Sequence, residues 1–197
     1  MKVELLGLGK KFNKEWIFRD LNYSFEDQSI TAITGNNGSG KSTLLRLISS
    51  FSDPTLGKIK YSINPPNHSI GYVAPYLELI EELTLWEHLE FHFQFRKTVL
   101  AFDEMITEAG LKAAINKPIT DFSSGMKQRV KLLLAFFSQD QLLLLDEPCS
   151  NLDETGIQWY QNQLKSIIST RTIIIASNQR FEYDQCTSIL SIENFKR

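Results

Sequence analysis

The sequence has few cysteines, no long apolar segment and no excess of basic residues, and each shortage excludes a class of protein. Its two cysteines, Cys149 and Cys186, fit neither a disulfide framework nor the spacing of a metal site, which favours a reducing compartment. No apolar run approaches the roughly 18 residues needed to cross a bilayer. The formal net charge of −2 argues against the basic surface of a nucleic-acid-binding protein, so we expect no nucleic-acid partner.

What the chain does contain is enough for one full hydrophobic core. With 197 residues, of which 42% are hydrophobic, residues 1–197 are expected to form a single domain. Residues 1–4 begin directly in a strand pattern without the features of a signal peptide. We therefore expect a cytoplasmic protein.

One stretch matches a phosphate-binding loop at every demanding position. It reads Gly35, Asn36, Asn37, Gly38, Ser39, Gly40, Lys41, Ser42 and Thr43. Glycines let backbone N–H groups turn toward a di- or triphosphate where side chains would clash, and a helix beginning there adds the positive end of its dipole. Lys41 is expected to reach the β- and γ-phosphates of ATP, and the Ser42 hydroxyl to hold Mg²⁺. A strand over residues 29–34 should lead into this loop and a helix over 43–48 should leave it.

The N-terminal half is expected to contain antiparallel strands. Residues 3–8 and 16–25 predict two strands separated by a polar turn over residues 10–15. Residues 58–63 and 69–73 predict another strand pair around the proline-containing break at 64–67.

The remaining pattern predicts an α/β fold. Helical spacing runs from residue 84 to about 114 and again over 126–137. The short apolar runs 142–145 and 172–176 are typical of strands buried on both faces of a mainly parallel sheet. Residues 76–120 are therefore expected to form a mainly helical insertion.

Two acids follow the apolar run over residues 142–145. At the carboxyl end of a parallel strand, Asp146 would join Ser42 around Mg²⁺, and Glu147 would polarise a water aligned with the γ-phosphate. Alone, the acid pair is explained equally well by a turn at the end of a strand. Together with the phosphate loop, it completes a phosphoryl-transfer site.

A third motif precedes the acid strand by one helix. It reads Phe122, Ser123, Ser124, Gly125, Met126, Lys127, Gln128 and Arg129. Ser123 can cap a helix whose N–H groups point at a γ-phosphate, although an ordinary Ser-Ser-Gly cap is the plainer alternative. With these three motifs in order, the chain resembles an ATP-binding cassette (ABC) ATPase, a family with a Leu-Ser-Gly-Gly-Gln signature followed by a basic residue, Gln and Arg. The matching positions are Ser123, Gly125, Gln128 and Arg129, and the departures are Phe122, Ser124 and Met126.

The resemblance covers essentially the whole chain and implies a fold, a cofactor and a partner. The fold would be a P-loop NTPase of the ABC type, with a RecA-like core, an N-terminal antiparallel β subdomain and a helical insertion. Two ATP molecules would lie between head-to-tail cassettes, a homodimer or a pair of related cassettes, with Ser123 and Gly125 facing the partner's γ-phosphate. Residues 150–153 resemble the aspartate loop of the dimer interface. Phe12 matches an aromatic that stacks on adenine, with a core phenylalanine or stacking by Trp16 as alternatives.

Two positions depart from the family pattern, and both concern catalysis. The family usually has a Gln after the strand predicted at residues 69–73, where this chain has Pro75, which has no side-chain hydrogen-bonding group. A His that contacts the γ-phosphate is replaced by Asn178, which can donate one amide hydrogen bond but cannot become cationic. Because Lys41 and Glu147 remain, we expect slow but real ATP hydrolysis.

The resemblance also implies transport, with a separate membrane-spanning subunit and a location on the inner face of the cell membrane. The short chain and its Gln-lacking segment are similar to small exporter cassettes such as the haem-exporter ATPases, which favours export. A groove over residues 76–95 is the expected docking surface, although its rings, Tyr76, Trp86, Phe91, Phe93 and Phe95, could instead build the core of the insertion. A soluble ABC ATPase without a transport role and a slow ATP-gated switch remain alternatives.

Overall fold

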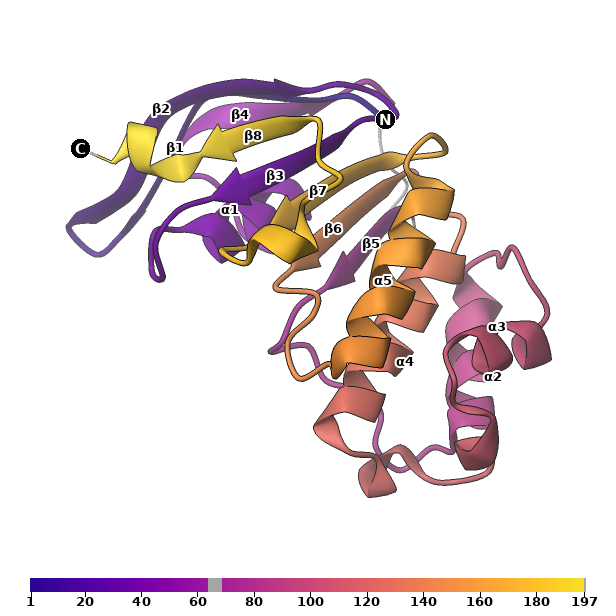
Figure 1. The fold of residues 1–197 in the computed structure, drawn as a ribbon. Coiled ribbons are helices and arrows are strands. Elements are labelled where there is room, and N and C mark those ends of the chain that lie inside the picture. The colour runs from indigo at the N-terminus through magenta and orange to yellow at the C-terminus, as the bar shows by residue number, and fades with distance from the viewer. Residues whose placement is uncertain (64–68, 197) are drawn as a thin grey trace.

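Two β-sheets enclose helix α1 in the computed structural model, which describes residues 1–63 and 69–196 (Figure 1). An antiparallel sheet has the order β2-β1-β4, and a parallel sheet has the order β5-β6-β7-β3-β8. The strands are β1 (Val3–Phe12), β2 (Glu15–Phe25), β3 (Ile30–Thr34), β4 (Leu56–Tyr61), β5 (Ile70–Val73), β6 (Leu142–Asp146), β7 (Thr172–Ala176) and β8 (Ser188–Ser191). The α-helices are α1 (Lys41–Ile48), α2 (Leu85–Phe95), α3 (Phe102–Glu108), α4 (Ser124–Phe137) and α5 (Glu154–Ile167).

The parallel sheet separates two hydrophobic cores, as its unbroken apolar strands predict. Alternate residues of β6 and β7 point to opposite faces, and every residue of both strands is buried. On one face, Leu144 and Ile174 pack with α1 and the antiparallel sheet. On the other, Leu143 and Ile175 pack with the core that includes residues of α2, α3, α4 and α5. Both expected apolar runs are confirmed as central strands.

One predicted strand pair is wrong. β4 pairs with β1 in the antiparallel sheet, with Leu5 opposite Ile59, whereas β5 pairs with β6 in the parallel sheet. The two strands are neighbours along the chain, and the prediction assumed that they also pair. The predicted break at residues 64–67 lies outside the described residues.

The ends of β1 and β2 differ from the predicted ranges at the turn between them. The turn between β1 and β2 contains just Asn13 and Lys14, and Asn13 has a φ of 52°. The polar turn expected over residues 10–15 is therefore shorter, because polar residues continue both strands. The sequence interpretation also missed α5 and β8. Helix α5 has a readable start, since Asp153 accepts a hydrogen bond from the N–H of Gly156.

The insertion is helical, as expected, and its first helix begins where the helical spacing predicts. Residues 76–84 form turns and irregular backbone, and α2 begins after Thr84, whose side chain forms a capping box with Glu87. Trp86 and Phe93 pack against Phe102 of α3, with ring centres 5.4 and 5.7 Å away. Helices α2 and α3 contact α4, so the insertion shares its core with the signature helix.

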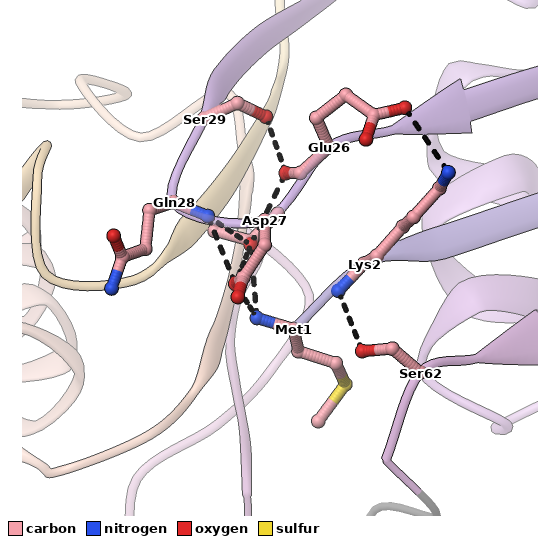
Figure 2. A network of polar contacts seen from close by, with 8 residues as sticks. Met1, Lys2, Glu26, Asp27, Gln28, Ser29 and Ser62 are labelled. Carbon is pink, nitrogen blue, oxygen red and sulfur yellow. Dashed lines mark hydrogen bonds and ion pairs between the residues drawn. The ribbon is translucent and has the colours of Figure 1, made fainter.

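A polar network joins the start of β1 to the parallel sheet (Figure 2). The Met1 ammonium group contacts the carboxylate of Asp27 and lies 3.3 Å from the Thr172 hydroxyl oxygen. Asp27 lies between β2 and β3, and Thr172 begins β7. The ammonium group holds the pKa of Asp27 below its usual value. The network therefore connects the two sheets at the end opposite the phosphate loop.

Replacing His92 of α2 with Gln should make the fold less sensitive to acid. Burial, with smaller contributions from the charges of Arg96 and His88, lowers the pKa of His92 to about 4 from an ordinary 6.5. The unfolded chain therefore binds this proton more tightly, so the stability is fully present above pH 6.5 and is lost as the pH falls toward 4. Urea unfolding at pH 7.5 and pH 5 should show the wild type losing on the order of 2 kcal/mol more than His92→Gln.

A matched variant separates titration from packing. The imidazole Nε2 lies 3.2 Å from the Ser138 hydroxyl, so Ser138→Ala should lower stability by a similar amount at both pH values. If wild type and His92→Gln lost the same stability between pH 7.5 and pH 5, that result would contradict a partly buried imidazole that is neutral in the folded chain.

Candidate nucleotide-binding site

The phosphate loop lies between β3 and α1 and has the backbone that its glycines permit. Gly38 and Gly40 have φ angles of 74° and 104°, in the left-handed region that favours glycine. A Cβ on Gly40 would also lie 2.4 Å from Cγ2 of Ile17, so a side chain there would displace β2. Helix α1 begins at Lys41, which directs its N–H groups toward the loop.

Lys41 lies folded into this loop. Its Nζ donates hydrogen bonds to the carbonyl oxygens of Gly35 at 2.8 Å and Asn36 at 3.2 Å. The side chain is buried, and burial lowers the pKa of Lys41, while the charges of Glu147 and Asp146 raise it. The ammonium group is thus held at the centre of the loop and close to both acids.

Asp146 and Ser42 fit a divalent cation. Asp146 ends β6 and is 1% exposed, and neither carboxylate oxygen completes a hydrogen bond of ordinary geometry within the described residues. Burial raises the pKa of Asp146 to about 6, whereas the nearby Ser42 hydroxyl lowers it. A buried carboxylate with unsatisfied oxygens, beside a hydroxyl, offers the oxygen ligands that Mg²⁺ prefers. The described part of the chain contains no cluster of three His, Cys, Asp or Glu side chains, so the cation would share its coordination with phosphate and water.

Glu147 and Asn178 lie around one cavity with the phosphate loop. Glu147 has a φ of 44°, and its N–H donates to the carbonyl oxygen of Ala176 at 2.9 Å. The cavity is lined by both residues together with Asn37 and Ser150. The Asn178 amide nitrogen donates to the Asn37 side-chain oxygen at 2.6 Å. The structure therefore brings together the candidate base, the residue in the place of the family His, and the loop.

Glu182 supports this cavity and was missed from the sequence. Its buried carboxylate accepts a hydrogen bond from the N–H of Cys149 at 2.7 Å and contacts the Ser177 hydroxyl. Burial raises the pKa of Glu182. The residue ties the loop after Glu147 to the loop that carries Asn178. No periodicity or motif distinguished this acid from a surface residue.

The signature motif lies elsewhere. Ser123 caps α4 by accepting a hydrogen bond from the N–H of Met126 at 3.2 Å. A Cβ on Gly125 would lie 2.8 Å from the carbonyl oxygen of Asn151, so the helix start packs closely against the predicted aspartate loop. A separate cavity opens in front of Ser123 and Gly125, with Arg129 on its wall. In Figure 1 this end of α4 lies at the bottom of the molecule, away from α1.

The candidate adenine contact lies at the tip of the β1–β2 hairpin. Phe12 is 52% exposed, so the alternative of a core phenylalanine is wrong. The Lys10 ammonium lies 5.3 Å from the centre of its ring. Trp16 is partly buried, and the cationic groups of Lys11 and Arg19 lie 5.4 and 5.1 Å from the centre of its ring. Both rings remain candidates for stacking.

Comparison with known proteins decides the family. The family model described as "ABC transporter" matches residues 18–150, which include the phosphate loop, the signature and the acid strand. The chain belongs to the ABC transporter family. Its fold is that of an ABC ATPase, and the sequence-based prediction of family, fold and ATPase class is confirmed.

Individual relatives agree with this assignment. The chain is 31% identical to the ABC transporter ATP-binding protein YybJ of Bacillus subtilis, over 90% of this chain and 86% of YybJ. It is 27% identical to the sulfate/thiosulfate import ATP-binding protein CysA of Synechocystis, over 100% of this chain and 59% of that protein. An ABC transporter ATP-binding protein from Pyrococcus furiosus has the same fold, with a TM-score of 0.86, 20% identity and full coverage of both chains. The ABC ATPase is thus a nucleotide-binding subunit whose described helices include none that could cross a bilayer.

Proposed function

We propose that this ABC ATPase binds Mg²⁺-ATP and hydrolyses it between two cassettes to drive a separate membrane subunit. The observation that carries the proposal is the division of the site between two surfaces. One surface carries the phosphate loop, with Lys41, Asp146 and Glu147 around it. The other is a separate cavity at the beginning of α4, which Ser123 and Gly125 face. Head-to-tail pairing of two copies, or of related cassettes, would complete each site.

Each residue has a defined part in this reaction. Lys41 would exchange its carbonyl partners for phosphate oxygens, and Glu147 would orient and deprotonate the attacking water. Asn178 would donate its amide to a γ-phosphate oxygen after leaving Asn37. Mg²⁺ held by Ser42 and Asp146 would neutralise charge on the β- and γ-phosphates. The signature helix of the partner would add N–H groups at Ser123.

Mixing two inactive variants tests the shared site. Lys41→Ala removes the phosphate ligand of one surface, and Ser123→Arg blocks the other. A mixed dimer contains one site with both surfaces intact, so the mixture should recover about a quarter of wild-type hydrolysis if the sites act independently, while each variant alone stays inactive. Phosphate release is the measurement. A mixture no more active than its components would contradict sites formed between two chains.

The membrane partner is proposed to dock at the insertion. Phe91 and Phe95 are 45% and 59% exposed and meet edge to face on the outer face of α2, with ring centres 5.5 Å apart, and Tyr76 is 43% exposed. By contrast, Trp86 and Phe93 pack against Phe102 inside the insertion. For these two rings, the alternative of a role in its core is therefore correct. Replacing Phe91 and Phe95 with Ser should abolish co-purification of the membrane chain while ATP binding persists. Unchanged co-purification would reject this surface.

The direction of transport is a further part of the proposal. We favour export because the short chain with Pro75 is similar to small exporter cassettes, although CysA is by name an import protein. The second candidate function is an ATP-gated switch with little turnover. Its support is Pro75, which lacks a polar side chain, and Asn178, whose amide is already bonded within the chain. Turnover by the complex with its membrane partner separates the two.

A further inference from the structure

The segment after β5 carries a polar cluster that the proposed reaction does not use. Pro75 stands where ABC ATPases usually carry Gln, and its side chain offers no hydrogen-bonding group. The next residue, Tyr76, places its hydroxyl in contact with the hydroxyl of Tyr72. The two rings meet nearly edge to face, with centres 6.4 Å apart. The chain thus brings a pair of hydroxyls to a place where the expected amide is missing.

The pair is anchored to the helix of the phosphate loop. The Arg46 guanidinium lies 4.8 Å from the centre of the Tyr76 ring. Arg46 is four residues after Ser42 in α1, so both side chains lie on the same face of that helix. The stack therefore fixes Tyr76 relative to Ser42.

The sheet register places the pair beside Asp146. Tyr72 pairs with Leu144, and Asp146 lies two residues further along β6 on the same face of the sheet. Burial raises the pKa of both tyrosine hydroxyls, and the charge of Asp146 raises each further. The hydroxyls therefore stay protonated at physiological pH, and they share this face with a buried carboxylate whose oxygens complete no hydrogen bond of ordinary geometry among the described residues.

We propose that Tyr72 and Tyr76 form a positioning pair that orients the Asp146 carboxylate toward the cation, in place of the absent Gln. A hydroxyl both donates and accepts, so one can donate toward Asp146 while the other completes the chain. Arg46 holds the second ring in place. The inference rests on the proposed Mg²⁺-ATP site and adds two residues of this chain to it.

The test measures how much the cation strengthens ATP binding. In a Glu147→Gln background, which prevents turnover, calorimetry gives the ATP Kd in excess Mg²⁺ and in excess EDTA, and their ratio is the contribution of the cation. Tyr76→Phe keeps the ring and the stack on Arg46, and Tyr72→Phe keeps the other ring. Each should reduce the ratio roughly 10-fold while the Kd in EDTA is unchanged. Adding Pro75→Gln to Tyr76→Phe should restore the ratio.

Tyr183→Phe is the matched control. Tyr183 also carries an arginine over its ring, Arg180 at 5.6 Å, and its variant should keep the wild-type ratio. The proposal would be overturned if Tyr72→Phe and Tyr76→Phe had the same Kd ratio as the control. It would also be overturned if they lost equal ATP affinity in Mg²⁺ and in EDTA, because that result indicates a structural role. If the Glu147→Gln protein without further changes had the same ATP Kd in Mg²⁺ and in EDTA, that result would instead contradict the cation site of the proposed function.

Discussion

Replacing Glu147 with Gln should lower steady-state ATP hydrolysis about 10²–10³-fold while Mg²⁺-ATP binding stays close to wild type. The carboxylate is exposed to the cavity that also holds Asn178 and Asn37, where an attacking water would lie. Gln keeps the size and polarity of the side chain but accepts no proton. Phosphate release by the protein with its membrane partner is the measurement.

Glu154 provides the control for this substitution. It is an exposed acid in the first turn of α5, and Glu154→Gln should leave the hydrolysis rate unchanged. Equal rates for Glu147→Gln and wild type would remove Glu147 from the mechanism. The local backbone also matters, because Glu147 has a positive φ that a sequence reading could not reveal.

Replacing Lys41 with Ala should weaken Mg²⁺-ATP binding 10- to 100-fold, the usual range for losing one or two charge-assisted hydrogen bonds. The Nζ of Lys41 already lies between the carbonyl oxygens of Gly35 and Asn36, so a phosphate oxygen would meet an ammonium group held in place. Calorimetric titration of ATP measures the effect.

The fold should tolerate this change better than the site does. Burial lowers the pKa of Lys41, which means that the folded chain carries a cost for keeping the ammonium charged. Thermal unfolding without nucleotide should therefore differ little between Lys41→Ala and wild type, and Lys58→Ala, on exposed β4, should change neither property. Wild-type ATP affinity in Lys41→Ala would contradict the assigned loop.

The parts of this site that could be predicted from the sequence are those where the backbone conformation allows few residue types. Glycines at the loop and an acid pair after an apolar strand follow from local geometry, so their positions could be read directly. Asp146 ends β6, Glu147 follows it directly, and Asn178 lies just beyond the end of β7, as their strands require. The residue-by-residue roles remain predictions.

Long-range pairing could not be read in the same way. β4 and β5 are adjacent in sequence, yet they belong to different sheets, because pairing depends on which distant strands are available. Glu182 and the Tyr72–Tyr76 pair are defined by tertiary contacts with Cys149 and Arg46, and no local pattern marks them. The helical insertion was recognised from periodicity, whereas α5 was missed although Asp153 marks its start.

Sedimentation equilibrium of the Glu147→Gln variant tests the central claim most directly. With saturating Mg²⁺-ATP, the account predicts a dimer that becomes a monomer without nucleotide or when Ser123→Arg is added, since the phosphate loop of one copy must face the signature helix of the other. A monomer under every nucleotide condition, even beside its membrane partner, would contradict the account.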